Sequence, residues 1–502
     1  MPKLCLPARP DLEHLKGQAR GLQARVRAGD PAALALVREL HPRPGVVDAP
    51  EVFRRTDSQL VVARQYGFAS WPELRRCVAL AVEFGRSPHK LADLDAVPAD
   101  EAATASADGD LPDRLLRLGC LLYGNDDVVR HRQARELLAA RPELAGANIW
   151  TAAAVGDVAA ARYLLDADPA SSTRAGGPFG WAPLLYLAYS RVNSDHPGHD
   201  PLATAQLLLD RGADPNAGYL WEGNYPFTAL TGLFGGGEDK SHQPAHSRAV
   251  EVARVLLEAG ADPNDSQTLY NRQFEPDDSH LRLLIEFGLG IDKAGPWHTR
   301  LRSTHGTPAQ LLEDQLTAAA RYDRPGWATL ALAAGADPDG RGTTHPVHHG
   351  LTPLAMALRR GNREVADLLL AAGATPPPAD PVEEFLSACL AGAATEVERL
   401  RAAQPTVLDE ARTRRPGAVL LAAELGRPAA VRLLVDLGFD VNARARITPL
   451  HQAAYDGNVE LVQTLLELGA DPHATDRSFG STPLGWAQHA RREAVIEILL
   501  FL

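Results

Sequence analysis

Apolar residues near the end of the chain recur with the spacing of two short amphipathic helices. The stretch "ITPLHQAAYDGNVELVQTLLELGADPHATD", residues 447–476, offers Thr448 as a helix cap and Pro449 as a first helical residue. Gly457 and Gly469 each follow an apolar run and are suited to end a helix. The second run, which we expect to be buried, consists of Val459, Leu461, Val462, Leu465 and Leu466. Helices this short need neighbours on which to bury their apolar faces.

A regular period along the chain supplies those neighbours. The helix-ending residues Gly361, Gly392, Gly426 and Gly457 follow one another at intervals of 31, 34 and 31 residues. Arg491 occupies the same slot 34 residues further on. This regularity predicts a stack of similar helix pairs, in which each pair buries its apolar face against the next.

The recurring phrases resemble those of ankyrin repeats. Units begin with "TPLHQAA", "LTPLAMA" or "STPLGWA" and end with "DRGADPN", "EAGADPN" or "ELGADPH", which is similar to the family's Thr-Pro-Leu-His signature and its period of about 33 residues. The resemblance implies an all-α ankyrin-repeat solenoid of stacked antiparallel helix pairs with projecting turns. It also implies a hydrogen bond between Thr448 and His451, because this unit alone keeps the family's histidine after Thr-Pro-Leu.

We expect three regions along the chain. Residues 1–98 are expected to form a small helical module, in which Ser70 and Glu73 have the spacing of a capping box. Its phrase "YGFASWPEL" resembles a helical segment found ahead of ankyrin arrays in some bacterial proteins. Residues 99–110 are small and polar, which is typical of a linker. Residues 111–502 then hold the repeat array, with about eleven repeats, some of them degenerate.

Composition fits a repeat array in the cytoplasm. Of the 502 residues 45% are hydrophobic, and no run of them resembles a signal peptide or a membrane span. Only five of the 51 basic residues are lysine, which favours a GC-rich, bacterial source. The four cysteines lie far apart, which predicts core thiols rather than a zinc site or a disulfide framework. They are Cys5, Cys77, Cys120 and Cys389.

Charge divides the chain into a basic front and an acidic remainder. Residues 1–90 carry 15 Lys and Arg against 9 Asp and Glu, while the rest carries 36 against 54. Exposed arginines on the front module would suit a nucleic-acid-associated regulator whose array recruits a partner. The alternatives are a solvated helical face, which we prefer, and docking of the module on the acidic array of its own chain. The arginines in question are Arg54, Arg55, Arg64, Arg75 and Arg76.

We find no catalytic signature in the sequence, and so expect neither an enzyme nor a cofactor. It contains no H-E-x-x-H, no G-x-S-x-G, no Walker loop and no dinucleotide fingerprint. Two histidine-rich loops remain, and side chains this close together are able to share a metal ion. One contains Asp195, His196, His199 and Asp200, and the other contains His345, His348 and His349. We favour solvated loops over a metal site in both.

Aromatic residues gather in one part of the predicted array. Trp181 and Phe227 precede the Thr-Pro slot of successive repeats, and others lie in the adjoining turns. Aromatic residues are enriched at binding hot spots, so these are candidates for contact with a partner. The alternative is that they pack one turn against the next. The candidate set is Phe179, Trp181, Tyr219, Trp221, Tyr225 and Phe227.

The last predicted helix has an apolar face that its predecessor lacks. Aligning "REAVIEILLFL" with "NVELVQTLLEL" places Ile498 and Phe501 where Thr464 and Glu467 stand. The two apolar residues share a helix face, which favours self-association or partner contact there, although a small exposed apolar end is also tolerated in proteins.

These patterns favour a non-enzymatic scaffold or adaptor that binds another protein on the concave ankyrin surface. We expect no membrane contact and do not expect nucleic acid as the principal partner. The identity of the protein partner does not follow from the sequence.

Overall fold

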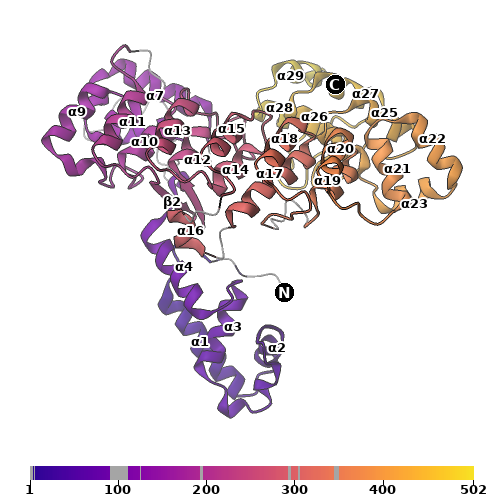
Figure 1. Cartoon of the computed structure of the whole chain (residues 1–502), viewed down its shortest axis with the longest axis horizontal. Helices are drawn as coiled ribbons and strands as arrows, with labels where there is room; N and C mark the ends of the chain where they lie inside the picture. Colours follow the sequence, from indigo (N-terminus) through magenta and orange to yellow (C-terminus); the bar gives the residue numbers. More distant parts are fainter. Residues whose placement is uncertain are drawn as a thin grey trace. The chain divides into compact units, whose positions relative to one another are not determined.

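The computed structural model describes residues 4, 6–90, 111–124, 126–192, 196–291, 295–302, 306–343 and 350–501. The predicted linker, residues 99–110, lies outside the described residues. Helices predominate in the described part, which confirms an all-α protein apart from one small sheet (Figure 1). The chain divides into two compact units. The first unit comprises Met1–Gly235, Ala245–Thr268 and Gly295–His305, and the second comprises Gly236–Pro244, Leu269–Ala294 and Gly306–Leu502.

The N-terminal module of the first unit is helical, as predicted. Its helices are α1 (Leu12–Arg27), α2 (Pro31–Leu40), α3 (Arg55–Gln65) and α4 (Trp71–Phe84), with the 3-10 turns η1 (Pro44–Val47) and η2 (Pro50–Val52). Ser70 caps α4 by accepting a hydrogen bond from the Glu73 N–H at 3.3 Å. The Glu73 carboxylate reaches the Ala69 N–H at 3.0 Å instead of that of Ser70, so the capping box is displaced by one residue. Buried side chains of α1, α2, α3 and α4, together with Phe53 between η2 and α3, form the core of the module.

The repeats of the first unit follow as successive helix pairs. They consist of α6 (Leu111–Gly119), α7 (Val128–Ala140), α8 (Ile149–Val155), α9 (Val158–Ala167), α10 (Pro183–Tyr189), α11 (Pro201–Asp210), α12 (Ala229–Phe234) and α13 (Ala249–Glu258), with η5 (Pro142–Gly146), η6 (Pro169–Ser172) and the separate helix α16 (Pro296–Leu301). The first helices α6, α8, α10 and α12 each contact the next, and the second helices α9, α11 and α13 do the same. Because like helices stack on like, each pair covers the apolar face of its neighbour.

A three-stranded sheet in the first unit is the main departure from the predicted all-α fold. Strands β2 (Gly218–Trp221) and β3 (Tyr225–Thr228) form an antiparallel hairpin, and β1 (Gly85–Arg86) pairs in parallel with β2. Glu222 and Gly223, in the turn, both have positive φ, a backbone conformation that hairpin turns require. Since β1 belongs to the N-terminal module, the sheet joins that module to the repeats within this unit.

The second unit is also a stack of helix pairs. It begins within α14 (Ser266–Arg272), followed by α15 (Ser279–Glu286), α17 (Pro308–Tyr322), α18 (Pro325–Ala333), α19 (Pro353–Arg360), α20 (Arg363–Ala371), α21 (Pro381–Leu390), α22 (Ala394–Ala403), α23 (Val407–Arg414), α24 (Ala418–Glu424), α25 (Pro428–Asp436), α26 (Pro449–Asp456), α27 (Val459–Glu467), α28 (Pro483–His489) and α29 (Glu493–Leu500). First helices again contact first helices, from α17 through α19, α21, α24 and α26 to α28. The orange-to-yellow helices of Figure 1 show this succession.

The residues predicted to end the first helices adopt the expected backbone conformation. Gly361, Gly392, Gly426 and Gly457 all have φ between 64° and 75°. Arg491, in the fifth slot, has φ 54°, which is unusual for a residue with a Cβ. The repeat therefore imposes its geometry even where the sequence supplies no glycine.

Two polar contacts explain why the signature residues recur. The Thr448 hydroxyl and the Nδ1 atom of His451 lie 2.7 Å apart, which confirms the hydrogen bond that the family resemblance implied. The other ring nitrogen, Nε2, lies 3.0 Å from the Ser481 carbonyl oxygen in the following repeat. His451 therefore ties its own helix cap to the next unit. Burial lowers the pKa of His451, which favours the neutral ring that such contacts need.

The asparagine that closes "GADPN" has a similar linking role. Asn216 donates to the Gly260 carbonyl oxygen at 3.0 Å and accepts from the Asp262 N–H at 2.8 Å in the next turn. In the second unit, Asn442 makes the same pair of contacts with Gly469 and Asp471, at 3.1 and 2.8 Å. One side chain thus satisfies a donor and an acceptor of its neighbour, which fixes the spacing of successive turns.

The predicted apolar stripe of α27 is buried except at Val459 and Leu466, which are half-buried. Leu461, Val462 and Leu465 are buried, whereas Leu466 is only half-buried and Thr464 is buried in its place. Leu466 is therefore less buried than the sequence predicts.

The cysteines of the described residues lie within the structure as free thiols. Cys120 and Cys389 are buried, and burial raises the pKa of each thiol to about 12. Cys77 is partly buried, and burial also raises its pKa. Cys5 lies outside the described residues. The three described cysteines therefore have the character of core thiols that the sequence predicts.

Candidate binding surface

Four of the six aromatic candidates are packed inside the first unit. Phe179, Trp181, Tyr219 and Phe227 are all buried. The Trp181 ring stacks on Tyr219, with ring centroids 5.0 Å apart and planes 25° apart, and also packs on Phe179 at 4.6 Å. A partner reaches only exposed atoms, so this geometry corresponds to the packing of one turn on the next.

Polar atoms of neighbouring aromatic residues hold the hairpin to the helices. The Tyr189 hydroxyl donates to the Thr228 carbonyl oxygen at 2.9 Å, and the Trp221 indole N–H donates to that of Leu122 at 3.2 Å. Tyr123 donates to the Thr231 carbonyl oxygen at 3.1 Å. Burial raises the pKa of the Tyr189 hydroxyl well above its usual value, so this donor keeps its proton. The hairpin is thereby fixed as a rigid projection of its repeat.

The tip of this hairpin exposes the remaining aromatic candidates. Tyr225 is 54% exposed, and Trp221, directly opposite it on β2, is half-buried. Beside them the carboxylate of Glu222 lies 3.0 Å from the Lys90 ammonium and 3.1 Å from His89 Nε2. Burial raises the pKa of Glu222, but hydrogen bonds from Lys90 and Ser87 outweigh it and lower the pKa overall. The tip therefore combines an exposed aromatic ring with a fixed ion pair.

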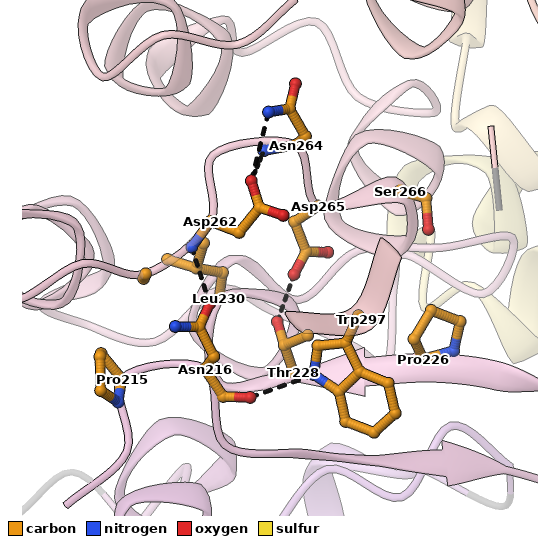
Figure 2. A pocket seen from close by; sticks show the side chains of 11 residues that line it. Pro215, Asn216, Pro226, Thr228, Leu230, Asp262, Asn264, Asp265, Ser266 and Trp297 are labelled. Atoms are coloured by element: carbon orange, nitrogen blue, oxygen red, sulfur yellow. Dashed lines mark hydrogen bonds between the residues drawn. The ribbon is translucent and has the colours of Figure 1, made fainter. Parts of the chain in front are cut away.

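A pocket beside the hairpin is lined by the closing turns of two repeats (Figure 2). Its polar groups already have partners in the first unit. Asn216 accepts at its carbonyl oxygen from the Trp297 indole N–H at 3.0 Å, and the carboxylate of Asp265 accepts from Thr231 at 3.2 Å and from Thr228. Burial raises the pKa of Asp265. The pocket thus contains a hydrogen-bond network that positions the turns.

The two histidine loops of the sequence differ in how much of them the structure describes. In the first loop, His196 is exposed, and its ring centroid lies 4.7 Å from that of the half-buried His199. Asp200 does not join them, because its carboxylate caps α11 by accepting from the Leu202 and Ala203 N–H groups. Asp195 and the whole of the second loop, His345, His348 and His349, lie outside the described residues.

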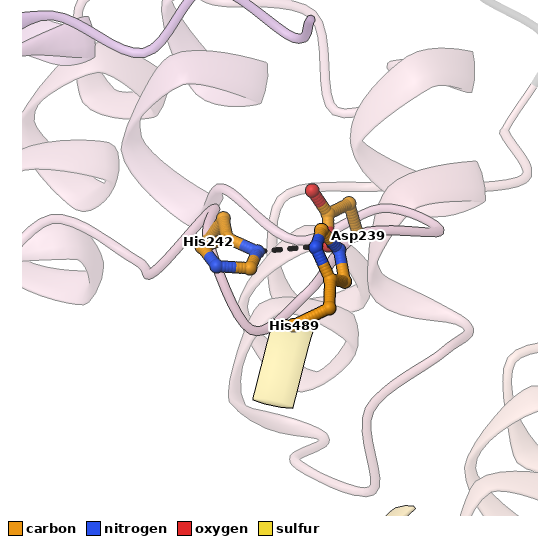
Figure 3. Close-up of side chains that lie close together, drawn as sticks. All are labelled: Asp239, His242 and His489. Atoms are coloured by element: carbon orange, nitrogen blue, oxygen red, sulfur yellow. Dashed lines mark hydrogen bonds and ion pairs between the residues drawn. The ribbon is translucent and has the colours of Figure 1, made fainter. Parts of the chain in front are cut away.

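A different group of metal-ligand side chains comes together in the second unit. Asp239, His242 and His489 each offer one ligand atom, and these atoms lie within 4.8 Å of one another (Figure 3). Sequence inspection missed this group because His489 lies 250 residues from Asp239. The local signal was the spacing of Asp239 and His242 in "DKSH", which by itself is too common to indicate a site.

The apolar residues of the last helix differ in exposure. Phe501 is 89% exposed and Leu500 is also exposed, while Ile498 is half-buried and packs against the core of the second unit. The expected apolar face of Ile498 and Phe501 is therefore accessible mainly at Phe501.

Two of the five arginines considered for nucleic acid are engaged within the first unit. Arg64 donates to the Leu40 carbonyl oxygen at 2.8 Å, and Arg76 donates to those of Arg300 and Leu301. Arg54, Arg55 and Arg75 are exposed. Docking of the module on its own chain, one of the alternatives raised by its charge, accounts for the Arg76 contacts.

The stacked helix pairs and their projecting turns define a repeat solenoid, and comparison with known proteins agrees. Ankyrin repeats in three copies match residues 386–476 and 419–501, and a single ankyrin repeat matches residues 349–380. The C-terminal part of the chain, residues 349–380 and 386–501, therefore contains ankyrin repeats. Ankyrin repeats are generally protein–protein interaction modules and are typically non-enzymatic.

One curated relative is similar to this chain in sequence over a short stretch. A stretch of 52 residues is 48% identical to the serine/threonine-protein kinase VIK of Arabidopsis thaliana. It covers 10% of this chain and 12% of the kinase, an extent comparable to one or two ankyrin repeats. The likeness is therefore one of repeats and carries no kinase activity to this chain. Among the described helices, none has both the length and the apolar character needed to cross a bilayer.

Proposed function

We propose that this chain is a non-enzymatic scaffold or adaptor in the cytoplasm of a bacterium, which binds another protein on the surface formed by its first helices and projecting turns. The observation that carries the proposal is the stack of the first helices α6, α8, α10 and α12 in the unit that also holds the hairpin with its exposed Tyr225. A preorganised aromatic side chain supplies contact area at little entropic cost. The ion pair of Glu222 and Lys90 adds a polar rim beside it.

A matched pair of tyrosine variants tests this assignment. The full chain carrying an affinity tag is used to capture proteins from its native cell, and the dominant partner is then purified for affinity measurement. Tyr225→Ala is expected to weaken binding by tenfold or more, whereas Tyr163→Ala, which removes an exposed tyrosine from the second helix α9, is expected to leave affinity unchanged. Equal affinities for both variants would remove the hairpin tip from the binding surface.

The exposed end of α29 supports a second contact, either with a partner or with another copy of this chain. Phe501 and Leu500 present adjacent apolar side chains there. Substituting Leu500→Lys together with Phe501→Glu is expected to shift the sedimentation coefficient or to reduce partner retention, with little change in melting temperature because both side chains are exposed. A monomer before and after substitution, with unaltered capture, would show that this end makes no such contact.

A further inference from the structure

Two distant segments of the second unit place three metal-ligand side chains around one point. Asp239 and His242 belong to the turn of residues 236–244, and His489 is the last residue of helix α28 in the final helix pair. Asp239 Oδ1 lies 3.0 Å from His242 Nδ1 and 3.2 Å from His489 Nε2. The two imidazole rings face the same carboxylate, with their centroids 4.6 Å apart (Figure 3).

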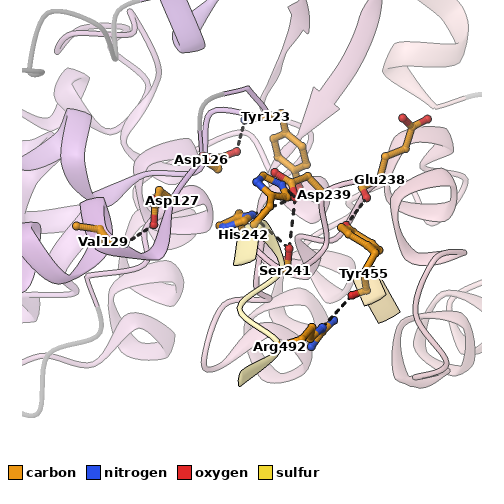
Figure 4. Close-up of polar contacts among 11 residues, drawn as sticks. Tyr123, Asp126, Asp127, Val129, Glu238, Asp239, Ser241, His242, Tyr455 and Arg492 are labelled. Atoms are coloured by element: carbon orange, nitrogen blue, oxygen red, sulfur yellow. Dashed lines mark hydrogen bonds and ion pairs between the residues drawn. The ribbon is translucent and has the colours of Figure 1, made fainter. Parts of the chain in front are cut away.

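The turn that carries Asp239 and His242 is held rigidly by residues outside the ligand set. The Tyr455 hydroxyl on α26 donates to the Glu238 carbonyl oxygen at 3.0 Å (Figure 4). Tyr270 donates to the Glu238 carboxylate at 2.8 Å. The Gly237 N–H donates to the Asn271 carbonyl oxygen at 3.0 Å. Arg492, three residues after His489, donates to the Tyr455 carbonyl oxygen at 2.9 Å. Both sides of the group are therefore anchored to α26.

The three ligand atoms have the spacing and the chemistry of a zinc site. Bonds of about 2.0–2.1 Å in a tetrahedral arrangement place neighbouring ligand atoms about 3.3 Å apart. The two distances from Asp239 Oδ1 are close to that value, and the third separation lies within 4.8 Å. Two imidazole nitrogens and one carboxylate oxygen favour Zn²⁺ and similar transition-metal ions over Mg²⁺ or Ca²⁺, which prefer oxygen alone.

Burial and charge around the group suit one bound cation. The side chain of His242 is buried, whereas those of Asp239 and His489 are 36% and 57% exposed, so an ion has an open path to the site and room for water. The nearest lysine in the sequence, Lys240, directs its ammonium toward Asp456 at 3.8 Å and toward the Phe274 carbonyl oxygen at 3.3 Å. Its charge is thus partnered elsewhere in the unit.

We propose that Asp239, His242 and His489 bind a divalent transition-metal ion, for which Zn²⁺ is the best match, and that the ion fastens the turn of residues 236–244 to the final helix pair. In the absence of metal, the Asp239 carboxylate accepts hydrogen bonds from both rings. The ion replaces the two ring protons between these atoms and holds the same three residues in place. This metal site differs from both histidine loops considered in the sequence and from the expectation that the chain binds no metal.

Zinc titration of the full chain tests the proposal. The protein is stripped of metal with a chelator, and Zn²⁺ affinity and stoichiometry are measured by competition with a chromophoric chelator. We expect one site with submicromolar affinity, and an increase in melting temperature when Zn²⁺ is added. His489→Ala is expected to weaken binding at least tenfold and to abolish that increase. Because His489 is exposed, the substitution leaves the fold intact, and Asp239→Asn provides a second variant from the opposite segment.

Control variants separate this site from other histidines. His473→Ala removes an exposed histidine near the same end of the chain, and a combined His196→Ala and His199→Ala variant removes the first loop pair. A third control replaces His345, His348 and His349 with alanine. All three are expected to bind Zn²⁺ as the unchanged protein does. The proposal is overturned if stripped protein binds no Zn²⁺ above the His489→Ala level, or if one of the controls, rather than His489→Ala, loses the tight site.

Discussion

Aromatic side chains of similar type occupy opposite environments in this chain. Tyr219 is buried in a stack with Trp181, while Tyr225, only a few residues after Tyr219, is 54% exposed. Sequence position identified both as residues of projecting turns, and that part of the interpretation holds for the hairpin. The register of β2 and β3 places Tyr219 and Tyr225 on the same face of the hairpin, so their exposure differs because Tyr225 lies at the tip. Composition and spacing alone do not specify that register.

The difference in burial predicts opposite effects of two substitutions. Trp181→Ala is expected to lower the free energy of unfolding by about 3–5 kcal/mol, since it leaves a cavity in the aromatic stack. Tyr225→Ala is expected to change it by no more than about 0.5 kcal/mol, because its ring is largely in water. Urea denaturation of the two variants measures both values. Equal losses of stability would mean that the two rings do not differ in burial as described.

Buried histidines predict that stability decreases in acid. Burial lowers the pKa of His246 to about 3, from 6.5 for an ordinary histidine, and the charges of Arg191 and Arg248 lower it further. Below pH 6.5 the unfolded chain therefore binds a proton that the folded chain does not. The free energy of unfolding should fall by up to about 1.4 kcal/mol per pH unit for this group as pH decreases from 6.5 toward 3.

Urea denaturation between pH 8 and pH 5 checks this sign. A His246→Gln variant lacks the titrating ring, so its stability should fall less steeply below pH 6.5 than that of the unchanged protein. Parallel curves for the two proteins would contradict the assigned pKa shift.

At the scale of single elements, helices were predictable and the sheet was not. Cap residues such as Thr448 and Ser70, with apolar spacing, are local signals, and each marks a helix start in the structure. The hairpin also has a local signal, since apolar and aromatic residues flank "EGN" at its turn. Strand β1 has none, because two residues become a strand only by pairing with β2, about 130 residues further along the chain.

Arg491 offers a test of the geometry that each repeat imposes on its turn. Its φ of 54° brings its Cβ close to the backbone, a cost of about 1 kcal/mol that glycine avoids. Arg491→Gly is therefore expected to raise the melting temperature. Arg491→Ala removes the same side chain beyond Cβ but keeps the strained conformation, so it should give no increase. An equal increase in both variants would indicate that the arginine side chain, and not the backbone, is unfavourable.

At the scale of the whole molecule, the repeat period of the sequence predicted stacked helix pairs but not the division of the chain into two units. Residues 236–244 belong to the second unit, although the residues on both sides of them belong to the first. Residues 295–305 belong to the first unit, although the residues on both sides of them belong to the second. No local pattern reveals this, since it depends on contacts such as those of Glu238 with Tyr270 and Tyr455. The candidate metal group arises in the same way, from residues brought together only by the fold.

Because the repeats are stacked, we expect a destabilising substitution to loosen the nearby repeats first. Leu465 is buried in the core of the second unit, so Leu465→Ala is expected to cost about 2–5 kcal/mol. Because each repeat packs mainly on its neighbours, hydrogen exchange should accelerate first in residues 420–501, and helices α6–α13 should keep their protection. Uniform acceleration along the whole chain would show that the repeats unfold as one cooperative block.

The binding surface itself is tested most directly by hydrogen exchange of the full chain with and without its purified protein partner. We predict slower exchange in the hairpin, residues 218–228, and in the first helices that stack beside it, with no change in the second helices α9, α11 and α13. Protection confined to the second helices or to the N-terminal module would contradict a scaffold that binds through its first helices and turns.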